Sequence, residues 1–463
     1  MSNVQTKNSK IDIFENKPVL QALSIMAVPT IVSQLITLIY NWADTFFLGL
    51  LNNSYQISAS SICHPAFMMT SAIANLFGIG GASVISRALG VKNEDRAKKM
   101  AAFSIMWAII TSLVYSLIIF IFQEPILELS GATINTMQYA KDYLLYVVIL
   151  GSLPSVLNYT LSHLIRSTGK TKVASFGVIL GAATNIILDP ILIFTFKLEI
   201  AGAAIATCLA NLVSCLFFAI YLIIKRKETV IGFSKDRLKI KENVFGDMFS
   251  TGISSFFLTL MAIFSNISIN KLTSIYDDFA VSGVSIAKKI DMLAFSISMG
   301  ISQGILPLVA YNHSSKNFKR RNAVIKGSSI ILISFSLLFV IVVFPFAEFF
   351  VSLFINHQET IAYGKDFLRI LCLSMPLACL LFLVNTIFQA TKETKKALTV
   401  TLCRKGIVDI PLMLLLNAFI PLYGIIISQP LIDVVGTLVA IPLFINFIKK
   451  DKKEISENKK ILN

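Results

Sequence analysis

Long apolar segments alternate with short polar loops along nearly the whole chain. Each segment has about 20 residues or more, the length that an α-helix needs to cross the hydrocarbon core of a membrane. The apolar residues lack the period-two alternation of transmembrane β-strands, and unpaired backbone cannot face lipid, so we predict helices. We count twelve segments, with approximate bounds 19–48, 57–80, 97–122, 136–160, 173–196, 201–224, 244–272, 279–310, 323–347, 361–387, 396–419 and 423–448.

The composition and charge agree with a multi-pass membrane protein. The 463 residues are 55% hydrophobic and 14% charged, which leaves too little polar surface for a soluble protein of this size. The formal net charge is +15, a value that would suggest nucleic acid as a partner of a soluble protein. Here the basic residues lie in short loops, so they indicate contact with anionic lipid headgroups, and we expect no nucleic-acid binding.

The basic loops all fall on one side of the predicted membrane. They contain, among others, Arg96, Lys170, Arg226, Lys319 and Lys392. Loops on the other side hold few basic residues, such as Lys141 and Lys365. Because basic loops remain in the cytoplasm, we predict that both termini are cytoplasmic.

The second half of the chain repeats the first half. YAKDYL at 139–144 returns as YGKDFL at 363–368, SLP at 152–154 as SMP at 374–376, and Gly78-Ile79 as Gly300-Ile301. Six helices separate each pair, so both halves have the same orientation in the membrane. The predicted parts are a cytoplasmic tail 1–18, an N-lobe 19–224, a basic linker 225–243, a C-lobe 244–448 and a basic tail 449–463. Two six-helix bundles related by a parallel repeat favour a transporter that rocks about a central site.

Two carboxylates interrupt the apolar segments of the N-lobe. A charge at mid-membrane is costly, so each is a functional candidate. Asn185 and Asp189 are four residues apart and share a helix face, and Thr207 follows on the next segment. Asp44 lies near the same depth on the first segment. These oxygen atoms predict a site for Na⁺ or for protons; the alternative is that Asp189 only forms a local hydrogen bond beside Pro190.

The C-lobe holds three further intramembrane carboxylates. Lys288 with Asp291 and Lys405 with Asp409 have helical pair spacing, which favours structural ion pairs. Asp433 has no local partner, so it either pairs across helices or faces the cavity and attracts cationic compounds. The candidates for a substrate cavity are Asp433, Asp291, Met68 and Met292.

Several motifs together resemble one transporter family. NWADTFFLG, GIGGASVISRALG, RSTGKTKVAS, TNIILDPILIF and ISQGILPLVAYN, in this order within twelve repeated segments, are similar to the multidrug and toxic compound extrusion (MATE) family and most to its MepA-type bacterial branch. The resemblance implies an all-α membrane protein of the MATE fold. It also implies an antiporter that exports bulky, lipophilic, often cationic compounds from the bacterial cytoplasmic membrane, driven by Na⁺ or H⁺, without a cofactor and as a monomer.

The resemblance also assigns roles to individual residues. Members carry a cation site in the N-lobe, and Asp44, Asn185, Asp189 and Thr207 match its positions. A proline fifteen residues before the first aspartate bends helix one in some members, and Pro29 matches it. Some members also carry acidic residues on helices seven and ten. The corresponding segments here, 244–272 and 361–387, have no carboxylate in their interiors, and Asp247 and Asp366 lie near their ends, so a C-lobe cation site of that kind is not expected.

Three other functions compete with drug export. A flippase for lipids or lipid-linked precursors has a related architecture, but it would favour a strongly cationic cavity. A membrane-embedded enzyme would need a clustered catalytic motif, and we find none, so we do not expect an enzyme. A receptor or scaffold would not need buried carboxylates.

Overall fold

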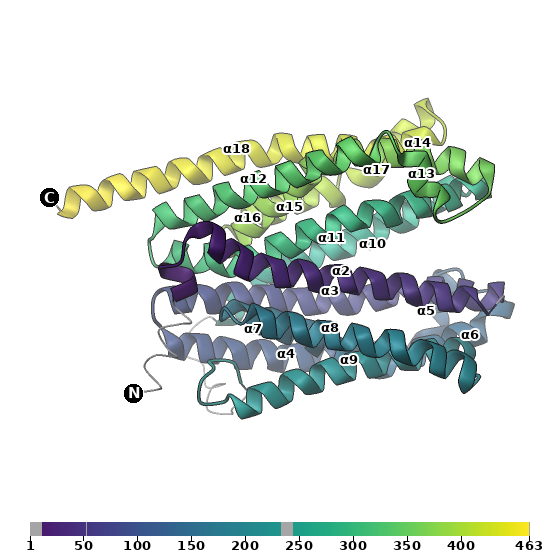
Figure 1. Cartoon of the computed structure of the whole chain (residues 1–463), viewed down its shortest axis with the longest axis horizontal. Helices are drawn as coiled ribbons and strands as arrows, with labels where there is room; N and C mark the ends of the chain where they lie inside the picture. Colours follow the sequence, from purple (N-terminus) through teal and green to yellow (C-terminus); the bar gives the residue numbers. More distant parts are fainter. Residues whose placement is uncertain (1–11, 52, 233–243, 463) are drawn as a thin grey trace.

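The computed structural model describes residues 12–51, 53–232 and 244–462. These residues are helical, and no β-strand occurs in those ranges. The helices form two bundles that lie one above the other in Figure 1, with α2 at the boundary between them. Nine of the described helices are long and apolar enough to span a membrane alone, and two more spans are bent helix pairs.

The N-lobe accounts for the first six predicted segments. Its helices are α2 (Val19–Gly49), α3 (Ser54–Gly90), α4 (Glu94–Ile121), the short α5 (Gln123–Leu129), α6 (Ile134–Leu144) continued by the π-helical η1 (Leu145–Leu150), α7 (Ser152–Ser167), α8 (Thr171–Pro190) continued by the π-helical η2 (Ile191–Thr195), and α9 (Glu199–Ile224). The predicted tail and linker extend over residues 1–11 and 233–243, which lie outside the described residues.

The C-lobe accounts for the other six segments. Its helices are α10 (Val244–Thr273), α11 (Asp278–Ser314), α12 (Phe318–Val343), the short α13 (Ala347–Ser352), α14 (Gln358–Leu373), α15 (Met375–Ala390), α16 (Thr394–Thr401), the π-helical η4 (Leu402–Gly406), α17 (Asp409–Phe419) and α18 (Tyr423–Leu462). The eleventh segment is therefore divided, whereas the sequence predicted one helix over 396–419. α18 also continues past the predicted boundary at 448, because Lys and Glu in the tail are good helix formers.

The predicted internal repeat is confirmed by two matching bends. The fourth segment bends by 46° between Leu150 and Ser152, and the tenth bends by 47° between Leu373 and Met375. A proline near the start of each second helix, Pro154 or Pro376, removes one backbone N–H from the helical ladder. The repeated SLP and SMP motifs thus mark the same bend in each lobe.

The same repeat appears in the loops at one end of the molecule. Lys92 (φ 57°) and Lys316 (φ 58°) both adopt the left-handed conformation, which is uncommon for residues with a side chain. Asn93 and Asn317 follow them and cap α4 and α12 by accepting a hydrogen bond from the amide three residues on, at 2.9 and 3.1 Å. Equivalent loops in the two lobes are therefore built by the same local interactions.

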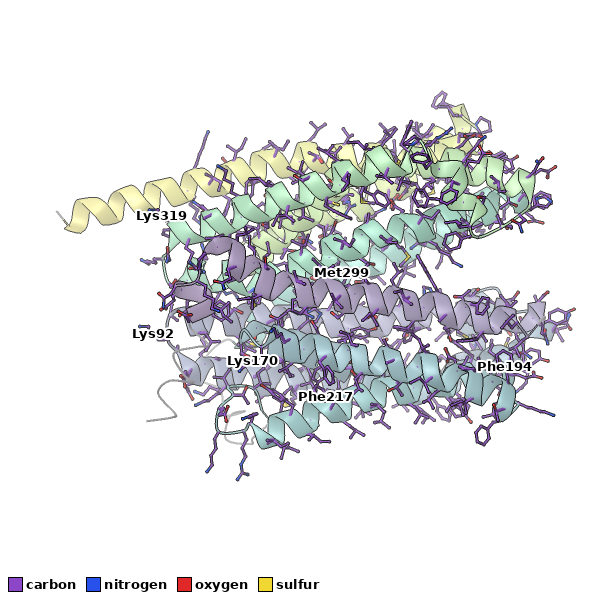
Figure 2. All side chains as sticks on the ribbon, in the orientation of Figure 1. Lys92, Lys170, Phe194, Phe217, Met299 and Lys319 are labelled. Atoms are coloured by element: carbon purple, nitrogen blue, oxygen red, sulfur yellow. The ribbon has the colours of Figure 1, made fainter. Side chains whose placement is uncertain are left out.

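Basic side chains gather at this end. Figure 2 shows Lys92, Lys170 and Lys319 at the end where α2 begins and Phe194 at the opposite end. We call the first the basic end and the other the far end. This separation agrees with the loop asymmetry in the sequence.

Glycines allow the lobes to approach closely in the half of the bundle near the basic end. Gly80 of α3 lies against Gly252 of α10, and Gly300 and Gly304 of α11 lie against the backbone of α2 around Ile31 and Ala27. Small residues permit this close packing of helices. Toward the far end, the lobes meet in an edge-on contact of Trp42 with Phe354, whose ring centroids are 5.7 Å apart.

The chain before α2 reinforces the contact at the basic end. Phe14 stacks on Tyr311 of the C-lobe with ring centroids 4.8 Å apart. Arg320 Nε donates to the carbonyl oxygen of Phe14 at 2.6 Å, and Arg320 Nη2 donates to that of Lys17 at 2.6 Å. Between the lobes, Arg96 Nη2 also pairs with Asp247 Oδ2. Aromatic, hydrogen-bond and charge contacts therefore join the lobes at this end.

Gly252→Ala should weaken the contact between the lobes. A β-carbon at this position would collide with the carbonyl oxygen of Leu76, and overpacking of this kind costs about 1–3 kcal/mol. We expect a lower midpoint of thermal unfolding in detergent by scanning fluorimetry. Gly49→Ala is the control, because no described atom lies within 4 Å of the added carbon; equal midpoints for the two variants would contradict the close packing.

Candidate functional site

The predicted N-lobe residues meet where α8 faces α9. Asn185 and Asp189 lie one turn apart on α8 and are 1% and 0% exposed. Asn185 Nδ2 donates to Asp189 Oδ1 at 3.3 Å and lies 3.4 Å from Thr207 Oγ1 of α9. One amide thus ties three of the four predicted residues together.

Asp44 of α2 completes this group from the neighbouring helix. α2 packs along α8, and the carboxylates of Asp44 and Asp189 lie close enough to interact electrostatically. α2 continues through Pro29 as one helix. The proline removes one backbone N–H from the helical ladder, and a bend at Pro29 stays a prediction.

Three oxygen atoms of this group have no hydrogen-bond partner among the described residues. They are Asp44 Oδ1, Asn185 Oδ1 and Asp189 Oδ2, all buried. A buried acceptor without a donor costs about 1–3 kcal/mol. Asp189 Oδ1 accepts a local hydrogen bond from Asn185 one turn earlier on α8, while Asp189 Oδ2 has no partner among the described residues, so local bonding satisfies only one of its two oxygens. The oxygens fit a hard cation, which prefers oxygen ligands, or protons on the two carboxylates.

A small pocket with both polar and apolar lining adjoins this group. Side chains from α2, α7, α8 and α9 line it, including Thr37, Tyr40, Asn158, Tyr159, Asn185 and Asn211. Asn158 Nδ2 donates to Asn211 Oδ1 at 3.0 Å, and Asn211 Nδ2 donates to the carbonyl oxygen of Thr207 at 2.9 Å. Asn158 and Asn211 were not predicted from the sequence as neighbours of this group. The spacing of Asn211 four residues after Thr207 was the available signal.

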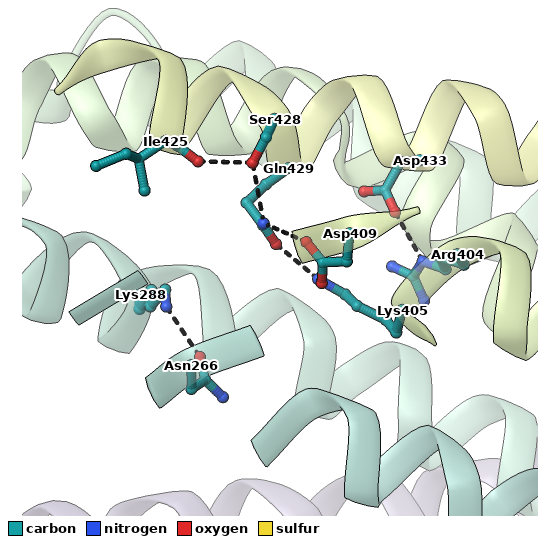
Figure 3. Close-up of polar contacts among 9 residues, drawn as sticks. All are labelled: Asn266, Lys288, Arg404, Lys405, Asp409, Ile425, Ser428, Gln429 and Asp433. Atoms are coloured by element: carbon teal, nitrogen blue, oxygen red, sulfur yellow. Dashed lines mark hydrogen bonds and ion pairs between the residues drawn. The ribbon is translucent and has the colours of Figure 1, made fainter. Parts of the chain in front are cut away.

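The C-lobe carboxylates have a different environment. Asp433 Oδ1 accepts from Arg404 Nε at 2.7 Å, and both residues are more than nine-tenths buried (Figure 3). Of the two alternatives for Asp433, the structure shows the pair across helices. It is therefore an ion-paired group and not a free negative charge facing a cavity.

The two predicted ion pairs within helical segments have different outcomes. Lys405 Nζ lies 3.6 Å from Asp409 Oδ2, which confirms that pair. Lys288 Nζ donates instead to Asn266 Oδ1 at 2.9 Å, and no ion pair with Asp291 is found in the described part of the chain, so that prediction was wrong. Rotation of the long lysine side chain toward α10 explains the difference.

The remaining cavity candidates are scattered. Met292 is 48% exposed, whereas Met68 and Asp291 are half-buried. Asp291 Oδ1 is buried without a hydrogen-bond partner among the described residues. These residues lie in different lobes, Met68 on α3 and the other two on α11, and the structure does not join them with Asp433 into one site.

Comparison with known proteins identifies the family. The sequence model of the MatE family matches residues 29–191 and again residues 251–415. The chain belongs to the MatE family. Each lobe is thus matched once, and the two matches are offset along the chain by the same interval as the repeated motifs.

The MatE relatives of this chain are transporters. The multidrug export protein MepA of Staphylococcus aureus (strain MRSA252) is 30% identical over 98% of this chain and 99% of its own length. The MepA protein of Staphylococcus haemolyticus is 29% identical over 94% of this chain and 95% of its own. An outward-facing MATE transporter of known structure has the same fold, with a TM-score of 0.89, 21% identity, and coverage of 96% of this chain and 99% of its own.

The family and the apolar helices together show a multi-pass membrane protein with the MATE fold. The predicted fold class is therefore confirmed. Within the described ranges, no cluster of three or more His, Cys, Asp or Glu side chains could hold a metal ion. The N-lobe group differs from such a cluster, because two of its four members are an amide and a hydroxyl.

Breaking the Arg404–Asp433 pair should destabilise the C-lobe strongly. Arg404→Met leaves a buried carboxylate without its partner, which costs about 3–5 kcal/mol, whereas Arg404→Met with Asp433→Leu should recover most of the loss. Chemical unfolding in detergent would measure both. Lys98→Met is the control, since its exposed pair with Glu94 at 3.9 Å contributes less than about 1 kcal/mol. A loss as small as the control's would show that Asp433 needs no partner.

Proposed function

We propose that this MatE protein is a cation-coupled antiporter that exports lipophilic, often cationic organic compounds by alternating access. The observation that carries the proposal is the group of buried oxygens on Asp44, Asn185 and Asp189 that lack donors among the described residues of an apolar bundle. Relatives that align along nearly the whole chain are multidrug export proteins, which supports the substrate class.

The N-lobe group would hold the coupling ion. The carboxylates of Asp44 and Asp189, the amide oxygen of Asn185 and the hydroxyl of Thr207 offer oxygen ligands for Na⁺, and the carboxylates alone can take protons. Either ion supplies the free energy of its transmembrane gradient. With both carboxylates ionised, Asp44 and Asp189 repel each other; neutralisation removes the repulsion and lets α2 pack closer to α8.

Helix α2 connects this group to the other lobe. Asp44 lies near the far end of α2, while its opposite half packs against α11 around Ala27 and Ile31. A change in how α2 sits on α8 therefore alters a surface that the C-lobe contacts. An ion or a drug shifts the lobes only if it binds one arrangement more tightly than the other. The close contacts near the basic end support an arrangement that opens at the far end.

We infer the membrane location, the orientation and the oligomeric state from the loop charges and the repeat. We place the protein in the bacterial cytoplasmic membrane with the basic end and both termini in the cytoplasm, because basic loops are retained there. The exposed apolar side chains of α4 and α9, such as Leu117 and Ile220, then face lipid. The repeat forms both lobes within one chain, which supports a monomer, and no cofactor is required beyond the coupling Na⁺ or H⁺.

Asp189→Asn should abolish coupled export. The amide keeps the size of the side chain but cannot carry the charge that holds a cation or a proton, so we expect at least a tenfold loss of ethidium efflux. Efflux would be measured from vesicles under a sodium gradient and, separately, under a proton gradient. Asp95→Asn is the control, because that carboxylate is 74% exposed and pairs with Lys99 at the surface.

The outcome separates the candidate functions. Efflux driven by one gradient and lost in Asp189→Asn identifies the ion. Full efflux in Asp189→Asn would contradict the role of the group. If neither gradient drives efflux of ethidium by folded protein, movement of a fluorescent lipid between leaflets becomes the measurement, and its presence would favour the flippase.

A further inference from the structure

The C-lobe contains a cluster of opposite charges that the proposed cycle does not use. Three cations and three carboxylates lie on α11, η4, α17 and α18, and Figure 3 draws all of them except the carboxylate of Asp291. They are Lys288, Arg404, Lys405, Asp291, Asp409 and Asp433. Asp291 interacts electrostatically with Lys288, Lys405, Arg404 and Asp433, and Asp409 joins this group through its ion pair with Lys405.

The internal repeat places this cluster at the position that the cation group has in the N-lobe. Asn266 is the counterpart of Asp44, and Gln429 is the counterpart of Thr207, because the same interval separates each pair as separates Gly78 from Gly300. The helices agree as well, because α10 and α18 are the seventh and twelfth segments and correspond to α2 and α9, the first and sixth. The two matches of the family model begin at the same interval along the chain, which supports the correspondence of Asn266 with Asp44 and of Gln429 with Thr207.

The third counterpart is Asp409, which corresponds to Asn185. The two segments begin at Thr171 and Thr394, and Asp409 lies one position further along its segment than Asn185 does, a shift that the π-helical η4 accounts for. The burial pattern agrees: Asn185 and Asp189 are buried four residues apart, and so are Asp409 and Met413. Asp409 thus occupies the place of Asn185, and an apolar residue occupies that of Asp189.

Each of these three C-lobe side chains is engaged by a lysine. Lys405 Nζ donates to Gln429 Oε1 at 2.6 Å and lies 3.6 Å from Asp409 Oδ2, while Lys288 Nζ donates to Asn266 Oδ1 at 2.9 Å (Figure 3). Asp409 Oδ2 has no hydrogen-bond partner among the described residues but has the Lys405 ammonium beside it, whereas oxygens of Asp44 and Asn185 at the corresponding N-lobe positions have neither a donor nor an ion-pair partner there. Lys288 and Lys405 therefore place ammonium groups at the C-lobe positions that correspond to the proposed ion ligands of the N-lobe.

Arg404 occupies the counterpart of the N-lobe pocket. By the same repeat, Arg404 corresponds to Gly181 and its partner Asp433 corresponds to Asn211, and both of these N-lobe residues line the pocket. The Arg404 side chain packs over Gly436 on α18. The ion pair of Arg404 and Asp433 thus occupies the region of the C-lobe that corresponds to the N-lobe pocket.

We propose that the C-lobe cluster is a cation site whose cation belongs to the chain: the Lys405 ammonium occupies it, supported by Lys288. The natural protein binds no free alkali cation there. Removal of the Lys405 charge exposes a site for a monovalent cation such as Na⁺, made by Asp409 and Gln429. Under the proposed function, which this inference extends, only the N-lobe carries the coupling ion.

Binding of radioactive sodium to purified protein in detergent, at alkaline pH, tests the proposal. All variants carry Asp44→Asn and Asp189→Asn, which remove both N-lobe carboxylates and keep the result independent of the proposed coupling role. We expect no stoichiometric sodium with Lys405 present and about one sodium per chain in Lys405→Met. Lys405→Arg should bind none because the charge is retained, and adding Asp409→Asn to Lys405→Met should abolish the gained site.

Lys289→Met is the matched control. Lys289 neighbours Lys288 on α11, but no hydrogen bond or ion pair joins it to Asp409, Gln429 or Asn266 among the described residues, so its removal should add no sodium site. Stoichiometric sodium in the background with Asp44→Asn and Asp189→Asn alone, or none in folded Lys405→Met, would overturn the proposal.

A replacement variant and the efflux measurement separate the test of the C-lobe site from the test of the N-lobe role. Should Lys405→Met fail to give monodisperse protein, Lys405→Gln takes its place, and the sodium measurement on the background with Asp44→Asn, Asp189→Asn and native Lys405 still decides whether the natural C-lobe site is closed. Failure of Asp189→Asn to affect ethidium efflux would contradict the N-lobe role and leave this result unchanged.

Discussion

A carboxylate inside an apolar helix bundle has to be compensated, and this requirement organises both lobes. An isolated buried charge is too costly to persist, so it needs a partner in the protein, a bound cation or a proton. Asp433 meets the requirement with Arg404, and Asp409 meets it with Lys405 and Gln429. Asp189 has only the weak amide contact of Asn185, and its second oxygen has no donor among the described residues.

The scaffold around these charges is the same in both lobes, which makes the chemical difference informative. Matching bends of 46° and 47° and matching left-handed lysines before an asparagine cap show that the repeat extends to the backbone. Differences in burial or helix position therefore cannot account for the different charges. The two lobes differ at a few corresponding positions, such as Asn266 for Asp44 and Asp409 for Asn185. The N-lobe has buried oxygens without donors among the described residues, and the C-lobe has lysines beside the corresponding side chains.

Close helix packing near the basic end gives this difference a mechanical consequence. α2 carries Asp44 toward one end and lies against α11 toward the other, where Gly300 and Gly304 bring the backbones together. A helix packed this closely cannot deform freely, so under the proposed function a change at Asp44 would move the helix as a unit. In the C-lobe, Asp409 and Asp433 have ion-pair partners within the lobe.

The sequence by itself determined the helical membrane fold, the repeat and the N-lobe residues. Length and hydropathy decide whether a segment spans a membrane, and the four-residue spacing places Asn185 and Asp189 on one helix face regardless of tertiary contacts. Only the tertiary structure decided how the C-lobe charges pair. Lys288 contacts Asn266 of another helix although Asp291 is nearer in sequence, and Asp433 finds Arg404 through a π-helical segment that divides the eleventh span. Long side chains choose partners across helices by packing geometry, and local spacing does not contain that information.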